Sequence, residues 1–344
     1  MSSSRIALGA LVVLSLAGLL SACGTDATSP RQTPISERTL AWASGGGGII
    51  ATSDGGSTWA RQESGTTAGL CAIAFADVLH GWAVGEKGTV VSTTDGGEHW
   101  SAQDSGTKHL LTSVTFVDPS HGWAGGNSGL ILATSDGGAT WRTQHTGRRQ
   151  QQISDVVFAD RESGWALVAD DPPAPQVLLA TVDGGEHWTT CEVGSVNGIT
   201  DFDFWDDRQG WIVNDWGRFF STDDGGVNWR RRAVRSPVGA ATSSAAFPSR
   251  SRGWVFGYDG QAFATTDGGR HWVRQHTGVR QILGEAAFVD DLHAFILGIN
   301  DPTSSVMPAD PGAALLATND GGEHWQKQVN PTGGLSDITC VRQR

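Results

Sequence analysis

The octet Thr93-Thr94-Asp95-Gly96-Gly97-Glu98-His99-Trp100 determines the fold of this chain, because its pattern Thr-x-Asp-Gly-Gly-x-x-Trp occurs seven times. The other six copies occupy residues 52–59, 134–141, 181–188, 222–229, 265–272 and 318–325. Their closing tryptophans stand 41 to 53 residues apart, and about 40 residues are enough for one four-stranded propeller blade. Seven copies therefore predict an all-β protein, a seven-bladed β-propeller with four-stranded blades.

Alternating apolar residues divide each repeat into four strands, A to D. In the second blade we expect them at residues 70–75, 81–85, 89–93 and 99–103. The first copy of the octet has residues for strands B, C and D, but none for strand A. Residues 335–340, Leu-Ser-Asp-Ile-Thr-Cys, align with strand A of the second blade. We therefore predict that this C-terminal strand pairs into the first blade and closes the ring, which removes a free sheet edge.

The composition excludes several classes of protein. With 47 glycines and 15 tryptophans among 344 residues, the chain does not suit a helical fold, since glycine destabilises helices. Its content of 38% hydrophobic and 17% charged residues does not fit a disordered acidic chain. The formal net charge of -12 disfavours a general nucleic-acid binder, which must neutralise phosphates. A local basic patch stays compatible with this charge.

The N-terminal residues have the composition of an export signal. Arg5 precedes an apolar run at residues 6–20, which is too short to span a bilayer as a permanent helix. The following Leu20-Ser21-Ala22-Cys23 resembles the lipobox of bacterial lipoproteins, in which the cysteine is acylated and the chain is cut just before it. The alternative is an ordinary secretory signal with a chance cysteine.

We therefore expect a signal peptide at residues 1–22, a lipidated tether at 23–38 that starts with Cys23, and a propeller at 39–344. The predicted location is the bacterial cell envelope, with the lipid anchor on the periplasmic or extracytoplasmic side. Beyond the anchor, Cys71, Cys191 and Cys340 form an odd set, so at least one thiol is free. The lack of a C-x-x-C pair disfavours metal ligation by these cysteines.

The octet is the Asp-box, or BNR repeat, and its residues have a structural explanation. The carboxylate accepts backbone N–H groups of the turn between strands C and D, the glycines allow positive φ, and the tryptophan packs on the sheet. The seven aspartates are Asp54, Asp95, Asp136, Asp183, Asp224, Asp267 and Asp320. One carboxylate per blade lies too far from the next for joint catalysis and supplies too few oxygens for calcium. We expect no metal and no cofactor.

A longer pattern, Phe-x-Asp-x-x-x-Gly-Trp-Ala-x-Gly before the octet, starts at Phe75 and Phe116. With it, residues 39–341 resemble the photosystem II stability/assembly factor family of seven-bladed propellers. The resemblance implies a non-enzymatic exported propeller that, in photosynthetic organisms, holds membrane-protein assembly intermediates through a basic patch on one face. Many relatives with this repeat resemble exported proteins of non-photosynthetic bacteria, so the resemblance indicates the fold more closely than the partner.

Two other functions compete with a scaffold. Sialidase-like glycoside hydrolases share the Asp-box, but they need a tyrosine nucleophile, and Tyr258, the one tyrosine, falls in a tight turn. Their Arg-Ile-Pro motif is absent, and xyloglucan hydrolases with Asp-boxes use a cleft between two propellers, whereas this chain has one. A cell-surface binder of carbohydrate or peptide is the other alternative, which exposed aromatic residues on the loop face would favour.

Antiparallel blades place the A-to-B and C-to-D turns on one face, the Asp-box face. The B-to-C and D-to-A connections lie on the opposite face, the loop face. Two insertions, residues 169–176 and 299–313, are both B-to-C connections. Insertions on one face indicate a functional surface, since loops on a rigid scaffold carry recognition.

The D-to-A connections also carry positive charge. Lys108, Arg149 and Arg280 each stand two residues after a glycine, and Arg148 and Arg235 are nearby. We predict a basic ring that binds an acidic segment of a membrane or envelope protein to a monomeric propeller; the alternative is scattered solvated cations. The Glu-His-Trp histidines, His99, His187 and His324, are expected on the edges of strands D rather than in a metal site.

Overall fold

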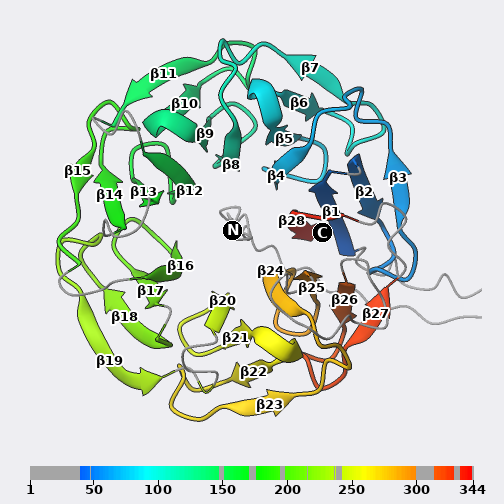
Figure 1. Ribbon diagram of the computed structural model, residues 1–344, viewed down its shortest axis with the longest axis vertical. Helices are drawn as coiled ribbons and strands as arrows, with labels where there is room; N and C mark the ends of the chain where they lie inside the picture. Colours follow the sequence, from blue (N-terminus) through cyan, green and yellow to red (C-terminus); the bar gives the residue numbers. More distant parts are fainter. Residues whose placement is uncertain are drawn as a thin grey trace, which may run out of the picture.

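The computed structural model describes residues 39–342, except 47, 147–150, 170–175, 194–197, 215, 236, 238–241, 300–313 and 329–333. Seven four-stranded antiparallel sheets form a closed ring around a central axis (Figure 1). The predicted all-β, seven-bladed propeller is therefore confirmed. The expected signal peptide and tether, residues 1–38, lie outside the described residues.

Each blade runs outward from the axis in the order A, B, C, D (Figure 1). Blade 1 contains β28 (Asp337–Arg342), β1 (Thr39–Gly45), β2 (Gly48–Thr52) and β3 (Ala60–Gln62). Blade 2 contains β4 (Leu70–Phe75), β5 (Gly81–Gly85), β6 (Val90–Thr93) and β7 (Ser101–Gln103). Blade 3 contains β8 (Leu111–Phe116), β9 (Gly122–Gly126), β10 (Leu130–Thr134) and β11 (Arg142–His145).

The remaining blades repeat this order. Blade 4 contains β12 (Gln152–Phe158), β13 (Gly164–Ala169), β14 (Val177–Thr181) and β15 (Thr189–Thr190). Blade 5 contains β16 (Ile199–Phe204), β17 (Gly210–Asn214), β18 (Arg218–Thr222) and β19 (Arg230–Arg235). Blade 6 contains β20 (Thr242–Ala246), β21 (Gly253–Gly257), β22 (Ala262–Thr265) and β23 (Val273–Gln275). Blade 7 contains β24 (Ile282–Phe288), β25 (Ala294–Ile299), β26 (Ala314–Thr318) and β27 (Gln326–Gln328).

The C-terminal strand closes the ring as predicted. β28 pairs with β1 over six positions, from Thr39 opposite Arg342 to Ser44 opposite Asp337. The Asp337 side chain also reaches the next blade, where its Oδ2 accepts the N–H of Ile73 at 2.9 Å. The two ends of the propeller therefore share one sheet, and this sheet is tied to blade 2 as well.

An aromatic stack joins neighbouring blades. Trp123 of β9 lies flat on Phe158 of β12, with ring centroids 3.5 Å apart and planes 5° apart. Phe158 also lies against Gly164, where an added Cβ would come within 2.5 Å of the ring. This contact explains the Gly-Trp pair at the start of strand B, because only glycine leaves room for the phenylalanine. Equivalent stacks join Trp42 to Phe75, Trp82 to Phe116 and Trp165 to Phe204.

Cys71, Cys191 and Cys340 are all free thiols. Cys71 and Cys191 are half-buried and Cys340 is buried, and burial raises the pKa of Cys191 to about 12. Such thiols stay protonated and are poor nucleophiles. Within the described residues, no helix is long and apolar enough to cross a membrane.

Candidate functional site

Each Asp-box folds its turn around one threonine and one aspartate. In blade 2 the Thr93 hydroxyl donates to Asp95 Oδ1 at 2.7 Å and accepts the N–H of Gly97 at 2.9 Å. Asp95 Oδ1 also accepts the N–H of His99 at 2.9 Å. The same bonds recur in all seven boxes, so the carboxylates stabilise turns and are not gathered at one site.

The seventh residue of the octet completes the box, which the sequence did not reveal. Its side chain bonds to Oδ2 of the aspartate in every blade: Thr58, His99, Thr140, His187, Asn228, His271 and His324. His99, His187 and His324 therefore precede strand D rather than lie on its edge, because the carboxylate holds them in the turn. Asp95, Glu98 and His99 come within 4.8 Å of one another, but they are mostly exposed and the His99 Nδ1 already bonds to Asp95.

These bonds favour the ionised carboxylate. The hydroxyl and N–H of Thr140 lower the pKa of Asp136 to about 2. The N–H and imidazole of His187 do the same for Asp183, whose pKa is also about 2. Hydrogen bonds to a carboxylate stabilise its charged form, so the boxes need ionised aspartates to hold their turns.

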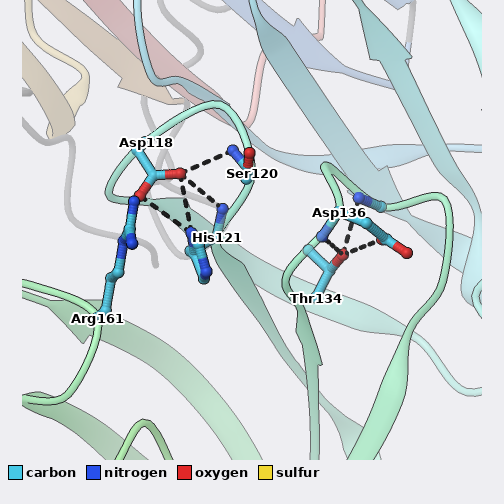
Figure 2. Close-up of polar contacts among 7 residues, drawn as sticks. Asp118, Ser120, His121, Thr134, Asp136 and Arg161 are labelled. Atoms are coloured by element: carbon cyan, nitrogen blue, oxygen red, sulfur yellow. Dashed lines mark hydrogen bonds and ion pairs between the residues drawn. The ribbon is translucent and has the colours of Figure 1, made fainter.

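A second repeated aspartate shapes the A-to-B turn in blades 2, 3, 4, 5 and 7, as Asp77, Asp118, Asp160, Asp206 and Asp290, whereas blade 6 has Ser249 there. In blade 3 Asp118 Oδ1 accepts the N–H groups of Ser120 at 2.8 Å and His121 at 3.0 Å. Arg161, from the A-to-B turn of blade 4, donates Nε to Asp118 Oδ2 at 2.8 Å. Figure 2 shows this cluster next to Thr134 and Asp136 of the blade 3 box. The Asp-box face is therefore hydrogen-bonded within and between blades.

The innermost strands carry a buried ring of polar side chains. Its members stand three residues before the phenylalanine of strand A in blades 3 to 7 and three before Cys340 in blade 1: Ser113, Asp155, Asp201, Ser244, Glu285 and Asp337. Blade 2 has the apolar Ala72 at this position. Asp201 Oδ2 accepts the Ser244 hydroxyl at 3.0 Å and the Ala245 N–H at 3.1 Å across the junction of blades 5 and 6. The register shifts at this position in blades 2 to 6, so the aspartates satisfy N–H groups that the bulges release.

Glu285 differs from the aspartates of this ring. Its side chain is 7% exposed, and the structure gives it no hydrogen bond among the described residues. Burial raises the pKa of Glu285 well above its ordinary value, and the nearby carboxylates of Asp337, Asp201 and Asp155 raise it further. Burial and like charges both favour the protonated form.

The loop face is arranged as predicted. The D-to-A connections touch the B-to-C turns: the Ser105 hydroxyl donates to the Gly88 carbonyl at 2.6 Å, and the Thr277 hydroxyl to Gly260 at 2.8 Å. Both insertions join strands B and C, because they connect β13 to β14 and β25 to β26. Most of their residues, 170–175 and 300–313, lie outside the described residues.

Among the five predicted cations, the structure describes the side chains of Lys108 and Arg280. Lys108 and Arg280 are exposed in the connections after β7 and β23, and blades 2 and 6 lie on opposite sides of the axis (Figure 1). Arg235 ends β19 opposite Arg218, but its side chain lies outside the described residues, as do Arg148 and Arg149 entirely. The basic ring therefore stays a prediction.

Blades 5 and 6 present aromatic side chains on the loop face. Trp216 is 56% exposed and Tyr258 is 41% exposed, both in B-to-C turns. The Arg218 guanidinium lies 5.1 Å from the centre of the Trp216 ring, and Asn214 Oδ1 accepts the N–H groups of both residues. The sequence signal for this feature was available: Asn-Asp-Trp-Gly-Arg replaces the Gly-x-x-Gly turn of blades 2, 3 and 6.

Comparisons with known proteins agree with this architecture. The family model of the photosynthesis system II assembly factor YCF48 matches residues 100–196 and 189–342. A solved structure of YCF48 bound to D1 peptide is 20% identical, with a TM-score of 0.58, and the match covers 77% of this chain and 83% of that one. YCF48 from Cyanidioschyzon merolae is also 20% identical, with a TM-score of 0.63 and coverage of 84% and 98%.

More distant propellers share the fold as well. A GH74 xyloglucanase from Xanthomonas campestris is 14% identical, with a TM-score of 0.61, and the match covers 90% of this chain and 53% of the enzyme. No curated protein matches the sequence. At such identities the solved structures establish the fold alone, whereas the family model spans most of the propeller.

Proposed function

The chain belongs to the family of the photosynthesis system II assembly factor YCF48, and from this premise we propose that it is an exported, lipid-anchored scaffold that binds a protein segment and catalyses no reaction. The observation that carries the proposal is the family match over residues 100–342. A related propeller is described as bound to a D1 peptide, which supports a protein partner. The pairing of β28 with β1 covers the inner edge of β1 within the chain, and this supports a monomer.

The proposed partner is an acidic segment of a membrane or envelope protein, bound on the loop face. Lys108 and Arg280 are exposed there, and Arg148, Arg149 and Arg235 are expected on the same face. Arginine holds a carboxylate through two parallel hydrogen bonds. Trp216 adds a large exposed ring next to the Arg218 cation, and such aromatic anchors contribute much of the binding energy at protein interfaces.

Capture of the partner tests this surface. We replace Arg148, Arg149 and Arg280 together by glutamate. This loop-face variant should fold normally but recover less partner than the wild type in pull-downs from envelope extracts, and its recovery should depend less on salt. The control is a second triple variant with the same change in charge. It replaces by glutamate three exposed arginines of the outermost strands: Arg61, Arg142 and Arg274. Equal recovery by the wild type and the loop-face variant at low and physiological salt would refute the assignment.

The anchor is tested separately. Cys23→Ser should release a soluble form or leave the precursor uncleaved, which cell fractionation and mass measurement distinguish. Unchanged fractionation of the variant with membranes would contradict lipidation at Cys23.

A second candidate function is binding of surface carbohydrate on the same face, which exposed Trp216 and Tyr258 favour, since aromatic rings pack against sugars as apolar surfaces. A glycan array with the wild type and Trp216→Ala decides between the two. If the wild type binds glycans, Trp216→Ala does not, and no protein is captured, carbohydrate binding would replace the first proposal.

A further inference from the structure

A cavity of about 330 Å³ lies between blades 5 and 6. Its lining includes Thr222 and Asp223 from the Asp-box of blade 5 and Gly268 and Gly269 from that of blade 6. The cavity therefore belongs to the Asp-box face, opposite the loop face described above. Small-molecule sites usually measure about 300 to 1,000 Å³, so this cavity has room for a compact ligand with a single ring.

The cavity exists because the aromatic stack between these blades is broken. Trp211 lies 5.2 Å from Phe247 at an angle of 60°, instead of flat upon it. Phe219, which replaces a smaller aliphatic residue on strand C, approaches Phe247 edge-on at 5.5 Å. The Trp211 Nε1 has no hydrogen-bond partner within the described part of the chain, whereas Trp165 in the preceding blade donates to the Gly225 carbonyl at 2.8 Å.

A third change adds an aromatic wall on the same side. Trp205 stands where blades 2 and 4 have Ala76 and Ala159, and its Nε1 donates to the Phe247 carbonyl at 2.7 Å. The indoles of Trp205, Trp211 and Trp272 and the ring of Phe247 all line the cavity. These walls suit a flat, apolar ring.

The polar side of the cavity is positive. In blade 3, Gln144 covers the next Asp-box and donates Nε2 to the Gly184 carbonyl at 2.7 Å. Blade 5 has the exposed Arg232 at this position, and Arg232 has no ion pair with any described residue. The other two arginines of the lining are partly neutralised, since Arg230 lies 3.3 Å from Asp223 and Arg250 lies 4.0 Å from Asp206.

We propose that this cavity binds a free aromatic carboxylate, a small organic acid with one ring. The ring would lie among the indoles, and the carboxylate would take two hydrogen bonds from Arg232. Arginine stays charged at all relevant pH values and matches a carboxylate in geometry. This site lies on the opposite face from the proposed protein-binding surface and does not depend on it.

Tryptophan fluorescence and calorimetric titration of the full chain with phenylacetate test the proposal, since three indoles line the cavity. We expect saturable binding below about 10 mM. Arg232→Gln, which installs the residue that five of the other six blades have, should weaken binding about tenfold. Arg231→Gln is the matched control, because Arg231 is an exposed neighbour on β19 outside the cavity lining. Trp211→Phe should also weaken binding, while the triple loop-face variant should bind as the wild type does.

Phenylacetamide, acetate, glucuronate and a short peptide ending in phenylalanine separate the possible ligands. The site is supported if the protein prefers phenylacetate over all four compounds and if Arg232→Gln weakens the binding of phenylacetate while Arg231→Gln does not. No saturable binding, equal binding of phenylacetamide, or equal loss in Arg231→Gln would overturn it. Tighter binding of glucuronate or of the peptide would overturn the assignment to a free aromatic acid and give the cavity to a sugar acid or a chain end.

Discussion

The junction of blades 3 and 4 and the junction of blades 5 and 6 are built alike near the axis and differently farther out. On the inner strands, Ser113 donates to Asp155 at 2.6 Å and Ser244 donates to Asp201 at 3.0 Å. One strand farther out, Trp123 of β9 stacks flat on Phe158 and bonds to the Gly184 carbonyl. Trp211 of β17 does not lie flat on Phe247, and its Nε1 has no hydrogen-bond partner among the described residues. The ring is therefore held at its inner strands, and the outer part of one junction is free to form a cavity.

This difference shows that the aromatic stack depends on its neighbours. Trp211 and Phe247 are the same residue types as Trp123 and Phe158, yet Phe219 and Trp205 occupy the space that the flat arrangement needs. An aromatic pair is worth about 0.5 to 1.5 kcal/mol beyond its buried area, and one hydrogen bond about 1 kcal/mol. The outer part of the irregular junction should be weaker by about these amounts.

The largest effect on stability is expected outside the two compared junctions, in blade 1, which β28 closes. Deletion of residues 335–342 removes the strand that pairs with β1 and the carboxylate that bonds to Ile73. The exposed sheet edge should abolish cooperative unfolding and promote aggregation, which calorimetry and size-exclusion chromatography detect. Deletion of residues 343–344 is the control. An unchanged melting curve for the longer deletion would contradict closure of the ring by β28.

The two tryptophans test the comparison directly. Trp123→Ala should destabilise the protein by about 4 kcal/mol, as large-to-small changes of buried aromatics do. Trp211→Ala should cost about 2 kcal/mol, because it loses no flat stack and no hydrogen bond. Denaturant unfolding of both variants measures the difference, and equal losses would show that the irregular junction is packed as firmly as the regular one.

The inner serines should behave alike in both regions. Ser113→Ala and Ser244→Ala each remove a buried hydrogen bond to a carboxylate, and we expect each to cost about 1.5 kcal/mol. Chemical denaturation provides the values. A much smaller loss for Ser244→Ala would mean that the irregular junction is loosened down to the axis.

Glu285, at the inner strand of blade 7, extends the comparison to a position without a serine partner. Its folded pKa is raised, so the folded state holds a proton that the unfolded state releases as pH rises above about 4.5. Stability should therefore fall between that pH and the folded pKa. Glu285→Gln should remove this slope and raise the melting temperature at pH 7 while matching the wild type near pH 4. A variant less stable than the wild type at pH 7 contradicts this account.

The Asp-boxes should give the smallest difference, because they are the same in both regions. Asp136 and Asp224 have folded pKa values of about 2, Asp224 through the side chain and N–H of Asn228. Their stabilisation is present above pH 4 and is lost as pH falls towards 2. Asp136→Asn and Asp224→Asn should flatten this acid transition equally in thermal melts from pH 2 to 5. Unequal slopes would show that the cavity reaches the box of blade 5.

Much of the architecture was predictable from the sequence because each blade repeats one local pattern. Strands A and B of blade 2 occupy the expected residues, Leu70–Phe75 and Gly81–Gly85. Strand D begins at Ser101 rather than residue 99, because His99 is bonded into the turn by Asp95. The closing strand was predictable as well, since its residues align with strand A and the first blade lacks one.

The sequence by itself determined the number of blades, their order and the closure, because turn chemistry and alternating apolar residues act over short distances. Only the tertiary structure decided the cavity, because contacts between blades join residues about 40 positions apart. At that range the outcome depends on side-chain volume. Trp205 fits its turn and Phe219 fits its strand, and their effect becomes visible only where they meet Phe247 of the next blade. Lys108 and Arg280 are a further case, since the ring places their blades, 2 and 6, on opposite sides of the axis (Figure 1).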